Sequence, residues 1–282
     1  MEEELSLRVG IVGLGLIGGS MAKAFREYTN CEVIGFDSNP EVTEAALACG
    51  AIDRVGSDDD LRRLDLLILA LYPKAAVDFA REHGAQIPRS CLVTDVCGIK
   101  TQVCAELSAL AREFGFRFAG SHPMAGREKV GFAASEASLF RGASYLITPC
   151  GASDEDVALL RRTAEALGFG RCVVTTPEEH DRMIAFTSQV PHALACAYVL
   201  SPQCPGHKGF SAGSYRDVSR VANINETLWT ELFLSNSGPL TDELDTLIAN
   251  LSAVRDAVRD GDAARLSELL RQGRLVKESL GE

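Results

Sequence analysis

The chain has 282 residues, of which 46% are hydrophobic and 24% charged, a composition ordinary for a soluble globular protein of about two domains. Its formal net charge is −11, which argues against a general binder of nucleic acids or acidic membranes, because such binding requires clustered Lys and Arg. No apolar run reaches the roughly 18 residues of a membrane span and the acidic start lacks the basic region of a signal peptide, so we expect a cytoplasmic protein without nucleic-acid or membrane partners.

Short apolar runs in the first 175 residues predict β-strands. They are rich in Val, Ile, Leu and Phe without alternation, which is typical of strands covered on both faces of a sheet. Helical patterns lie between most of them, for example at Glu41–Cys49 and Thr101–Phe114. This order predicts an α/β fold, with a doubly wound and mainly parallel Rossmann-type sheet as an N-terminal domain over residues 1–175. The expected strands are Arg8–Val12, Glu32–Phe36, Leu64–Leu71, Cys91–Thr94, Arg117–Gly120, Ser144–Thr148 and Arg171–Val174.

The glycine-rich run G-L-G-L-I-G at residues 13–18 follows an apolar strand and opens an apolar helix. Gly13 would make the tight turn, Gly15 would let the backbone approach a pyrophosphate, and Gly18 would let the helix pack closely on the strand. The start of the helix, with its free N–H groups and positive end, favours phosphate. We therefore predict a dinucleotide site that includes Gly13, Gly15, Leu16, Ile17 and Gly18.

Asp37 ends the strand that follows this helix, 19 residues after Gly18. A carboxylate at this point can accept hydrogen bonds from ribose hydroxyls, and it would repel a 2′-phosphate. No Arg or Lys lies between Asp37 and Glu41 to hold such a phosphate. The sequence therefore favours NAD over NADP as the cofactor.

His122 lies in the run G-S-H-P-M-A-G-R-E at residues 120–128, where an expected strand gives way to a His–Pro step. Residues that follow the carboxyl ends of strands in an open α/β sheet face the ligand crevice. Imidazole is suited to removing a hydroxyl proton while hydride leaves the same carbon, because its pKa lies near working pH. We therefore predict that His122 is the catalytic base, although a lone histidine is more often structural.

The character of the sequence changes after Pro177: strand patterns disappear, and we expect an all-helical domain over residues 176–282. Leu, Ile and Val recur at spacings of three and four from Leu240 to Val258, which predicts one apolar stripe on a helix. A last helix should follow Asp262 and run to about Lys277. We expect the apolar helices between residues 238 and 277 to form a two-fold homodimer, the alternative being a stripe that packs within its own subunit.

The helical half carries three groups of polar or aromatic residues that a substrate could contact. Pro191 inside a helix removes a backbone hydrogen bond and kinks it, which would place His192 at the kink. Arg216 and Arg220 are four residues apart, so on a helix they share a face and could hold a dianion, or else form a solvated, salt-bridged surface. A core position is the ordinary explanation for Trp229, the only tryptophan.

Taken together, these motifs resemble the prephenate/arogenate dehydrogenase family of tyrosine biosynthesis over nearly the whole chain. The resemblance rests on the order and spacing of G-L-G-L-I-G at 13–18, D-V-C-G-I-K at 95–100, S-H-P-M-A-G-R-E-K-V-G at 121–131, P-H at 191–192, Y-R-D-V-S-R-V-A at 215–222 and N-E-T-L-W at 225–229. It implies a Rossmann domain followed by a helical dimerisation domain. It also implies oxidative decarboxylation of prephenate or arogenate, with hydride transfer to NAD.

The resemblance implies roles for individual residues as well. His122 would be hydrogen-bonded to the substrate hydroxyl, and Arg220 would bind the ring carboxylate that leaves as carbon dioxide. Glu128 matches an acid near the entrance that can pair with this arginine. The remaining residues assigned to the substrate are His192, Trp229, Arg216 and Ser121, and Asp95 of the 95–100 motif is assigned to the cofactor site.

Two positions depart from the family pattern. Many members have a serine that contacts the catalytic histidine where this chain has Gly98, and a histidine where it has Gln189. Ser121 or a water could replace the missing hydroxyl. The orientation of His122 and the side-chain preference of the pocket are therefore open at this stage, as is the choice between prephenate and arogenate.

Two other functions also fit a Rossmann domain joined to helices. A β-hydroxyacid dehydrogenase would have a lysine acid/base in the helical domain, where we find Arg216 and Arg220 instead. A non-catalytic NAD-sensing protein would keep Asp37 but would not need His122 together with Arg220. No two of the nine cysteines have C-x-x-C spacing, so we expect reduced thiols and no bound metal.

We expect neither the regulatory ACT domain nor the fused chorismate mutase that some family members carry, because the glycine motif begins at Gly13 and the last helical pattern ends near residue 277. If tyrosine inhibits the enzyme, we therefore expect it to compete with the ring substrate in the region of Arg220 and His192. Inhibition from a separate site could instead lower the maximal rate at saturating substrate.

Overall fold

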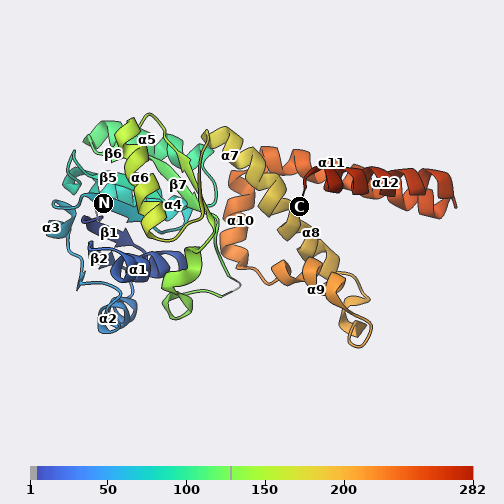
Figure 1. Ribbon diagram of the computed structural model, residues 1–282, viewed down its shortest axis with the longest axis horizontal. Coiled ribbons are helices and arrows are strands. Elements are labelled where there is room, and N and C mark those ends of the chain that lie inside the picture. Colours follow the sequence, from blue (N-terminus) through green and yellow to red (C-terminus); the bar gives the residue numbers. More distant parts are fainter. Residues whose placement is uncertain (1–4, 128, 282) are drawn as a thin grey trace.

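The computed structural model describes residues 5–127 and 129–281. Figure 1 shows an α/β domain joined to a helical arm, with the N-terminal half on the left and the last two helices projecting to the right. The α/β domain ends with strand β9 (Arg171–Val174), and the helical arm begins with helix α7 (Pro177–Ile184). The predicted boundary after residue 175 falls in the short connection between them.

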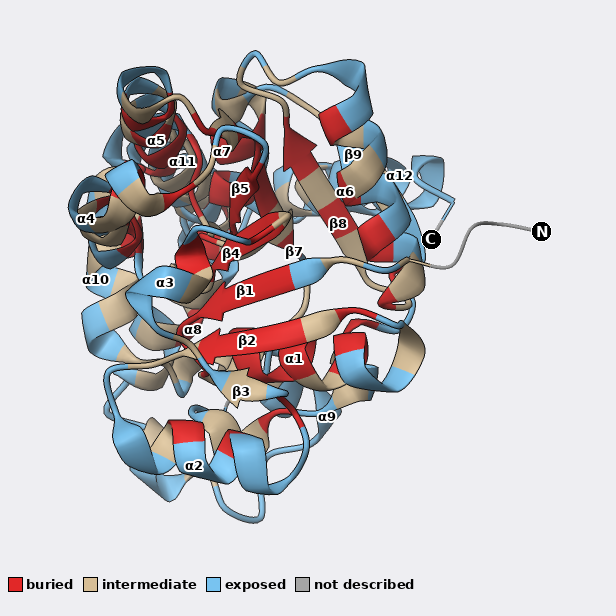
Figure 2. Cartoon of the chain, turned by 90° about the vertical axis from the view of Figure 1, so that its left-hand side faces the viewer, coloured by how far each residue is buried: buried red, intermediate tan, exposed pale blue. Residues whose placement is uncertain are grey.

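The main sheet has six parallel strands in the order β3-β2-β1-β4-β5-β6. This order, with the chain reversing direction between β1 and β4, is that of a Rossmann-type sheet and confirms the predicted fold class. Buried side chains fill β1, β2, β4 and β5, which explains why these strands are continuous apolar runs (Figure 2). The strands are β1 (Arg8–Val12), β2 (Glu32–Phe36), β3 (Arg54–Val55), β4 (Leu66–Leu69), β5 (Leu92–Asp95) and β6 (Arg117–Phe118).

Helices cover both faces of this sheet and begin and end at recognisable residues. Helix α2 starts where the Asn39 side chain accepts a hydrogen bond from the backbone N–H of Glu41, with Pro40 in the first turn. Helix α5 ends at Gly115, whose φ of 91° suits glycine. The helices of this domain are α1 (Leu16–Tyr28), α2 (Pro40–Ala48), α3 (Asp58–Leu61), α4 (Pro73–His83), α5 (Thr101–Phe114) and α6 (Asp154–Ala166).

The last three strands form a separate sheet, which corrects the expectation of one continuous sheet. Strands β7 (Gly120–Pro123) and β8 (Ser144–Thr148) are antiparallel, and β8 pairs in parallel with β9. The strand expected at Arg117–Gly120 is divided between β6 and β7. The chain leaves the main sheet because Ser121 bonds across the end of β5: its N–H and its hydroxyl donate to the Oδ1 and the backbone oxygen of Asp95, at 3.3 and 2.6 Å.

In the helical arm, α7 continues through a wide π-turn at residues 185–189 into α8 (Val190–Val199). The predicted kink assumed that Pro191 lies inside a regular helix. Pro191 instead lies in the first turn of α8, so its missing N–H falls next to the π-turn. The arm is completed by α9 (Gly213–Ser219), a 3₁₀ turn at residues 220–222, α10 (Glu226–Ser235), α11 (Ser237–Arg259) and α12 (Ala263–Ser279).

Helices α11 and α12 pack on each other and project away from the rest of the molecule (Figure 1). Much of the predicted apolar stripe is exposed in the single chain, including Ile248, Leu251 and Val258, and Leu270 and Val276 of α12 are exposed as well. None of the helices within residues 5–127 and 129–281 is long and apolar enough to cross a membrane.

Candidate active site

The glycine loop joins β1 to α1 at the carboxyl end of the main sheet. Gly13 has a φ of 87°, and a Cβ there would lie 2.5 Å from the backbone oxygen of Ala70, so only glycine fits. A Cβ on Gly18 would lie 1.9 Å from the Gly13 oxygen, which shows how closely the helix approaches the loop. Gly15 faces open space, and no side chain caps α1. The first turn of α1 therefore presents backbone N–H groups and a positive helix end, which fit a pyrophosphate.

Asp37 fixes this loop from the end of β2. Its Oδ2 accepts a hydrogen bond from the N–H of Leu14 at 2.8 Å, and its Oδ1 accepts one from the N–H of Asn39 at 2.9 Å. Each carboxylate oxygen can accept more than one hydrogen bond, so these contacts leave acceptor sites for ribose hydroxyls. Leu16 and Ile17 lie half-buried at the start of α1, next to the loop.

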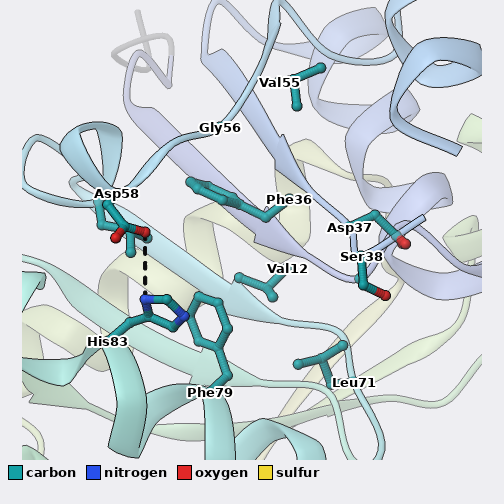
Figure 3. A pocket seen from close by; sticks show the side chains of 12 residues that line it. Val12, Phe36, Asp37, Ser38, Val55, Gly56, Asp58, Leu71, Phe79 and His83 are labelled. Carbon is teal, nitrogen blue, oxygen red and sulfur yellow. Dashed lines mark ion pairs between the residues drawn. The ribbon is translucent and has the colours of Figure 1, made fainter. Parts of the chain in front are cut away.

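A cleft of about 320 Å³ opens beside Asp37, between the ends of β1 and β2 and helix α4 (Figure 3). Its lining is mostly apolar, with a polar rim at Asp37, Ser38, Asp58 and His83. An apolar cleft adjoining the Asp37 carboxylate fits the flat base of a dinucleotide. The other lining residues are Val12, Gly13, Phe36, Val55, Gly56, Leu61, Leu71 and Phe79.

His122 lies in β7 and forms a hydrogen bond that the sequence did not lead us to expect. Its Nδ1 is 2.9 Å from Nε2 of His180 in α7, and the Nδ1 of His180 is 2.8 Å from Oδ1 of Asp181. Neither His180 nor Asp181 was predicted from the sequence. The adjacent His and Asp in the first helix after the domain boundary were the only available signal, and nothing in their spacing relates them to His122.

Asp181 is the fixed end of this chain of hydrogen bonds. Its Oδ1 and Oδ2 accept hydrogen bonds from the backbone N–H groups of Lys100 and Thr101, both at 2.7 Å, where α5 begins. A carboxylate only accepts, so the Nδ1 of His180 must donate to it and its Nε2 must accept. The Nδ1 of His122 then donates to that nitrogen. In the neutral ring the Nε2 of His122 is left as a proton acceptor.

The surroundings keep His122 in this neutral form. Burial, together with the neighbouring His180 and the Lys100 ammonium, holds the pKa of His122 well below its ordinary value. Burial also lowers the pKa of His180, against the opposing effect of Asp181. Although burial would raise the pKa of Asp181, its hydrogen bonds to His180 and Thr101 lower it overall. An ionised Asp181 and two neutral histidines therefore make His122 a base that is ready at neutral pH.

Asp95 and Ser121 are both fully buried, so neither side chain faces a ligand in this structure. Asp95 forms an ion pair with the buried Lys100 and accepts a hydrogen bond from the N–H of Cys97 at 2.9 Å. Burial alone would lower the pKa of Lys100, but the Asp95 carboxylate raises it overall. Ser121 accepts a hydrogen bond from the Tyr145 hydroxyl at 2.7 Å. In this structure Asp95 and Ser121 hold the end of β5 against β7 and thereby position His122.

The two departures from the family pattern have separate structural consequences. A Cβ at Gly98 would lie 3.9 Å from Cε1 of His122, so the missing serine would have been next to the His122 ring. Here Nδ1 of His122 donates its hydrogen bond to Nε2 of His180. Ser121, which with a water was the expected replacement for the missing hydroxyl, bonds instead to the backbone oxygen of Asp95. Gln189 is buried and bonds to the Leu232 oxygen and to Asn236, so it joins the π-turn to α10 and the start of α11.

The remaining predicted substrate residues lie on the helical arm. His192 stacks on Trp229 with ring centroids 3.8 Å apart, and its Nδ1 is 2.7 Å from the Ser188 oxygen. Trp229 is half-buried, so it is not the core residue that the sequence suggested. Arg216 and Arg220 are exposed, and the 3₁₀ turn that begins at Arg220 packs against α8, the helix of His192. Glu128 lies outside the described residues.

Two family models match consecutive parts of the chain. The nucleotide-binding domain of prephenate dehydrogenase matches residues 21–180, and its dimerization domain matches residues 176–272. The chain belongs to the prephenate dehydrogenase family. The predicted family and fold class are thereby confirmed, as is the predicted class of enzyme, a dehydrogenase with a nucleotide-binding domain.

Relatives of this family are similar to the chain over nearly its full length. The cyclohexadienyl dehydrogenase of Zymomonas mobilis is 30% identical over 96% of this chain and 95% of its own. The prephenate dehydrogenase of Aquifex aeolicus, solved with hydroxyphenyl propionate and NAD⁺, superposes with a TM-score of 0.86 at 26% identity and covers 99% of this chain and 100% of its own. The arogenate dehydrogenase of Synechocystis superposes with a TM-score of 0.82 at 25% identity and covers 98% of this chain and 100% of its own.

Proposed function

We propose that the chain catalyses the NAD-dependent oxidative decarboxylation of prephenate to 4-hydroxyphenylpyruvate, or of arogenate to tyrosine. The observation that carries this proposal is the chain of hydrogen bonds from Asp181 through His180 to Nδ1 of His122, which leaves Nε2 of that histidine as an acceptor. The glycine loop and Asp37 fit the diphosphate and ribose of NAD. The membership of the chain in the family supplies the class of substrate.

NAD, when bound, accepts the hydride from the ring carbon that bears the hydroxyl group. His122 acts on the hydroxyl of that carbon, because its Nε2 draws the proton away while carbonyl character develops. As the bond to the ring carboxylate breaks, its electron pair enters the ring and the proton returns to the oxygen. The products are a phenol, carbon dioxide and reduced cofactor, so the step balances without net release of a proton. Aromatisation favours the reaction, and the protein mainly has to align the substrate and hold the base.

The substrate carboxylates require cations, which the helical arm supplies. We assign Arg220 to the ring carboxylate, since a guanidinium pairs with a carboxylate through two hydrogen bonds. Arg216, one turn earlier in the chain, is assigned to the substrate as a second cation, and Glu128 is assigned to pair with Arg220, as the resemblance to the family implies. The stacked rings of His192 and Trp229 are assigned to the substrate side chain.

The direct test is to incubate the purified protein with prephenate or arogenate and with NAD or NADP, and to follow reduced cofactor and carbon dioxide together. We expect equal amounts of both products with at least one of the two substrates and faster turnover with NAD. Reduced cofactor with a β-hydroxyacid but not with either ring substrate would contradict the proposal. Binding of NAD without any turnover would instead indicate an NAD-sensing protein.

We also propose that the chain forms a homodimer through α11 and α12. These helices expose Ile248, Leu251, Val258, Leu270 and Val276 in the single chain, and burying such side chains is favourable. The second family model describes a dimerization domain, which agrees with this surface. Light scattering should give about twice the mass of the 30.2 kDa chain. A particle of the single-chain mass across a wide concentration range would contradict the dimer.

A further inference from the structure

The cleft beside Asp37 has a polar group at its far wall that the proposed reaction does not use. His83 is the last residue of α4, and its ring packs on Phe79 of the same helix, with centroids 4.5 Å apart. Both rings line the cleft on the side opposite Asp37 and Ser38 (Figure 3). With the ribose at Asp37 and the diphosphate at Gly15, the base of the cofactor would enter this cleft and reach that wall.

Neighbouring side chains determine which nitrogen of His83 carries the proton. The Asp58 carboxylate accepts a hydrogen bond from Nε2 of Gln86 at 3.4 Å, so the Gln86 amide presents its oxygen to His83. That oxygen lies 3.0 Å from Nδ1 of His83, and Oδ1 of Asp58 lies 3.6 Å from the same nitrogen. Because both neighbours are acceptors, Nδ1 must donate. In a neutral imidazole the other nitrogen, Nε2, is then an acceptor.

Figure 3 shows the second nitrogen of His83 on the opposite side of the ring from Asp58, next to Phe79. The nearest charged group is the exposed carboxylate of Glu82, 3.9 Å from Nε2. A carboxylate has no proton to donate, so Glu82 cannot satisfy an acceptor nitrogen. Nε2 is therefore suited to a ligand that brings a hydrogen-bond donor into an otherwise apolar cleft.

We propose that Nε2 of His83 accepts a hydrogen bond from the exocyclic amine of the cofactor's adenine, and that His83 thereby selects adenine over purines with an oxygen at this position. Adenine presents an N–H₂ donor there, whereas hypoxanthine presents a carbonyl oxygen that would face the acceptor nitrogen. The proposal rests on the assignment of NAD as cofactor and adds a residue that reads its base. His83 is far from the reacting atoms, so its contribution is to affinity and specificity.

The proposal is tested by binding, measured by titration calorimetry at pH 8, where histidine side chains are ordinarily neutral. The two probes are NAD and nicotinamide hypoxanthine dinucleotide, which differ in the amine and the adjacent ring proton. We expect the unmodified protein to bind NAD roughly 5- to 150-fold more tightly, the range for leaving a partly buried acceptor unpaired. His83→Phe keeps a ring against Phe79 and removes the acceptor, so the ratio of the two dissociation constants should fall to near one.

Two further variants test whether the difference in affinity between the two dinucleotides comes from the hydrogen bond to Nε2 of His83. Glu82→Ala removes the exposed charge nearest to Nε2 without adding a donor and should leave the ratio unchanged. Gln86→Leu removes the amide that orients the His83 ring and should reduce the ratio. A ratio near one in the unmodified protein, or an unchanged ratio in His83→Phe, would overturn the role of His83 while leaving NAD as the cofactor. Failure of the unmodified protein to bind either dinucleotide would overturn the cofactor assignment itself.

Discussion

Replacing His180 by leucine tests whether a residue that does not touch the substrate controls the catalytic base. The Nδ1 of His122 donates to Nε2 of His180 over 2.9 Å, in a partly buried position. Without that acceptor, His122 has an unpaired donor and no bond that fixes its tautomer or the direction of its ring. As His122 takes up the hydroxyl proton in the transition state its ring gains positive charge, so its hydrogen bond to His180 becomes charge-assisted. Losing such a bond costs about 1.5–3 kcal/mol in the transition state, which corresponds to a fall in kcat of about 10- to 150-fold.

The assay is steady-state turnover with saturating ring substrate and NAD, accompanied by calorimetric titration of NAD. We expect kcat to fall in His180→Leu while the affinity for NAD changes little, because the glycine loop and Asp37 are on other elements. His180→Gln is the matched control, since its amide can accept from His122 and donate to Asp181, and it should retain more of the turnover. Thermal unfolding of both variants checks that the fold persists. A kcat of His180→Leu within twofold of the unmodified protein would refute the reasoning.

The pH profile gives a second readout that a purely structural role would not change. His122 must be neutral to act, and its depressed pKa means that kcat/KM should remain high below pH 6.5 and fall only in more acidic solution. His180 contributes to this depression through the positive charge that it would itself carry in acidic solution. In His180→Gln that charge is gone, so the acidic limb of the profile should move to higher pH. An acidic limb that does not move would separate His180 from the titration of the base.

Further predictions address the other site residues. His122→Asn should lower kcat by roughly 10²- to 10⁴-fold and leave NAD binding intact, and near-normal turnover would remove His122 as the base. Arg220→Gln should raise KM for the ring substrate by roughly 10- to 150-fold, because the variant loses a charge-assisted hydrogen bond to the ring carboxylate. A change confined to the KM for NAD would contradict the carboxylate role. Asp37→Ser should bring the Michaelis constants for NAD and NADP closer together. It should also weaken the binding of NAD, because Asp37 accepts a hydrogen bond from the N–H of Leu14 in the glycine loop. An unmodified enzyme that prefers NADP would refute this prediction. Gly98→Ser should fold normally, since its Cβ meets Leu232 at 3.5 Å and nothing closer, and in the His180→Gln background it should restore part of kcat; no gain there would mean that a hydroxyl cannot orient His122.

The sequence by itself determined the local features of this protein. Apolar runs without alternation predicted the bounds of β1, β2, β8 and β9 to the residue. In β1 and β2 the reason is burial on both faces of the sheet, whereas β9 is mostly exposed in the single chain despite its apolar run. The glycine loop was recognisable because the positive φ of Gly13 and the close approach at Gly18 admit no other residue. The stripe from Leu240 to Val258 predicted α11 for a similar reason, since its period is that of a helix.

The tertiary structure decided which distant side chains meet. His122 and His180 are 58 residues apart and lie on elements from different halves of the chain, and no periodicity relates them. The same holds for His83, Gln86 and Asp58 at the wall of the cleft. Asp95 and Ser121 were assigned to ligands from the motifs that contain them, but the turn from β6 into β7 buries both against each other. A sequence pattern shows which face of an element is apolar, whereas hydrogen bonds between elements depend on how those faces pack, and only the folded chain shows that.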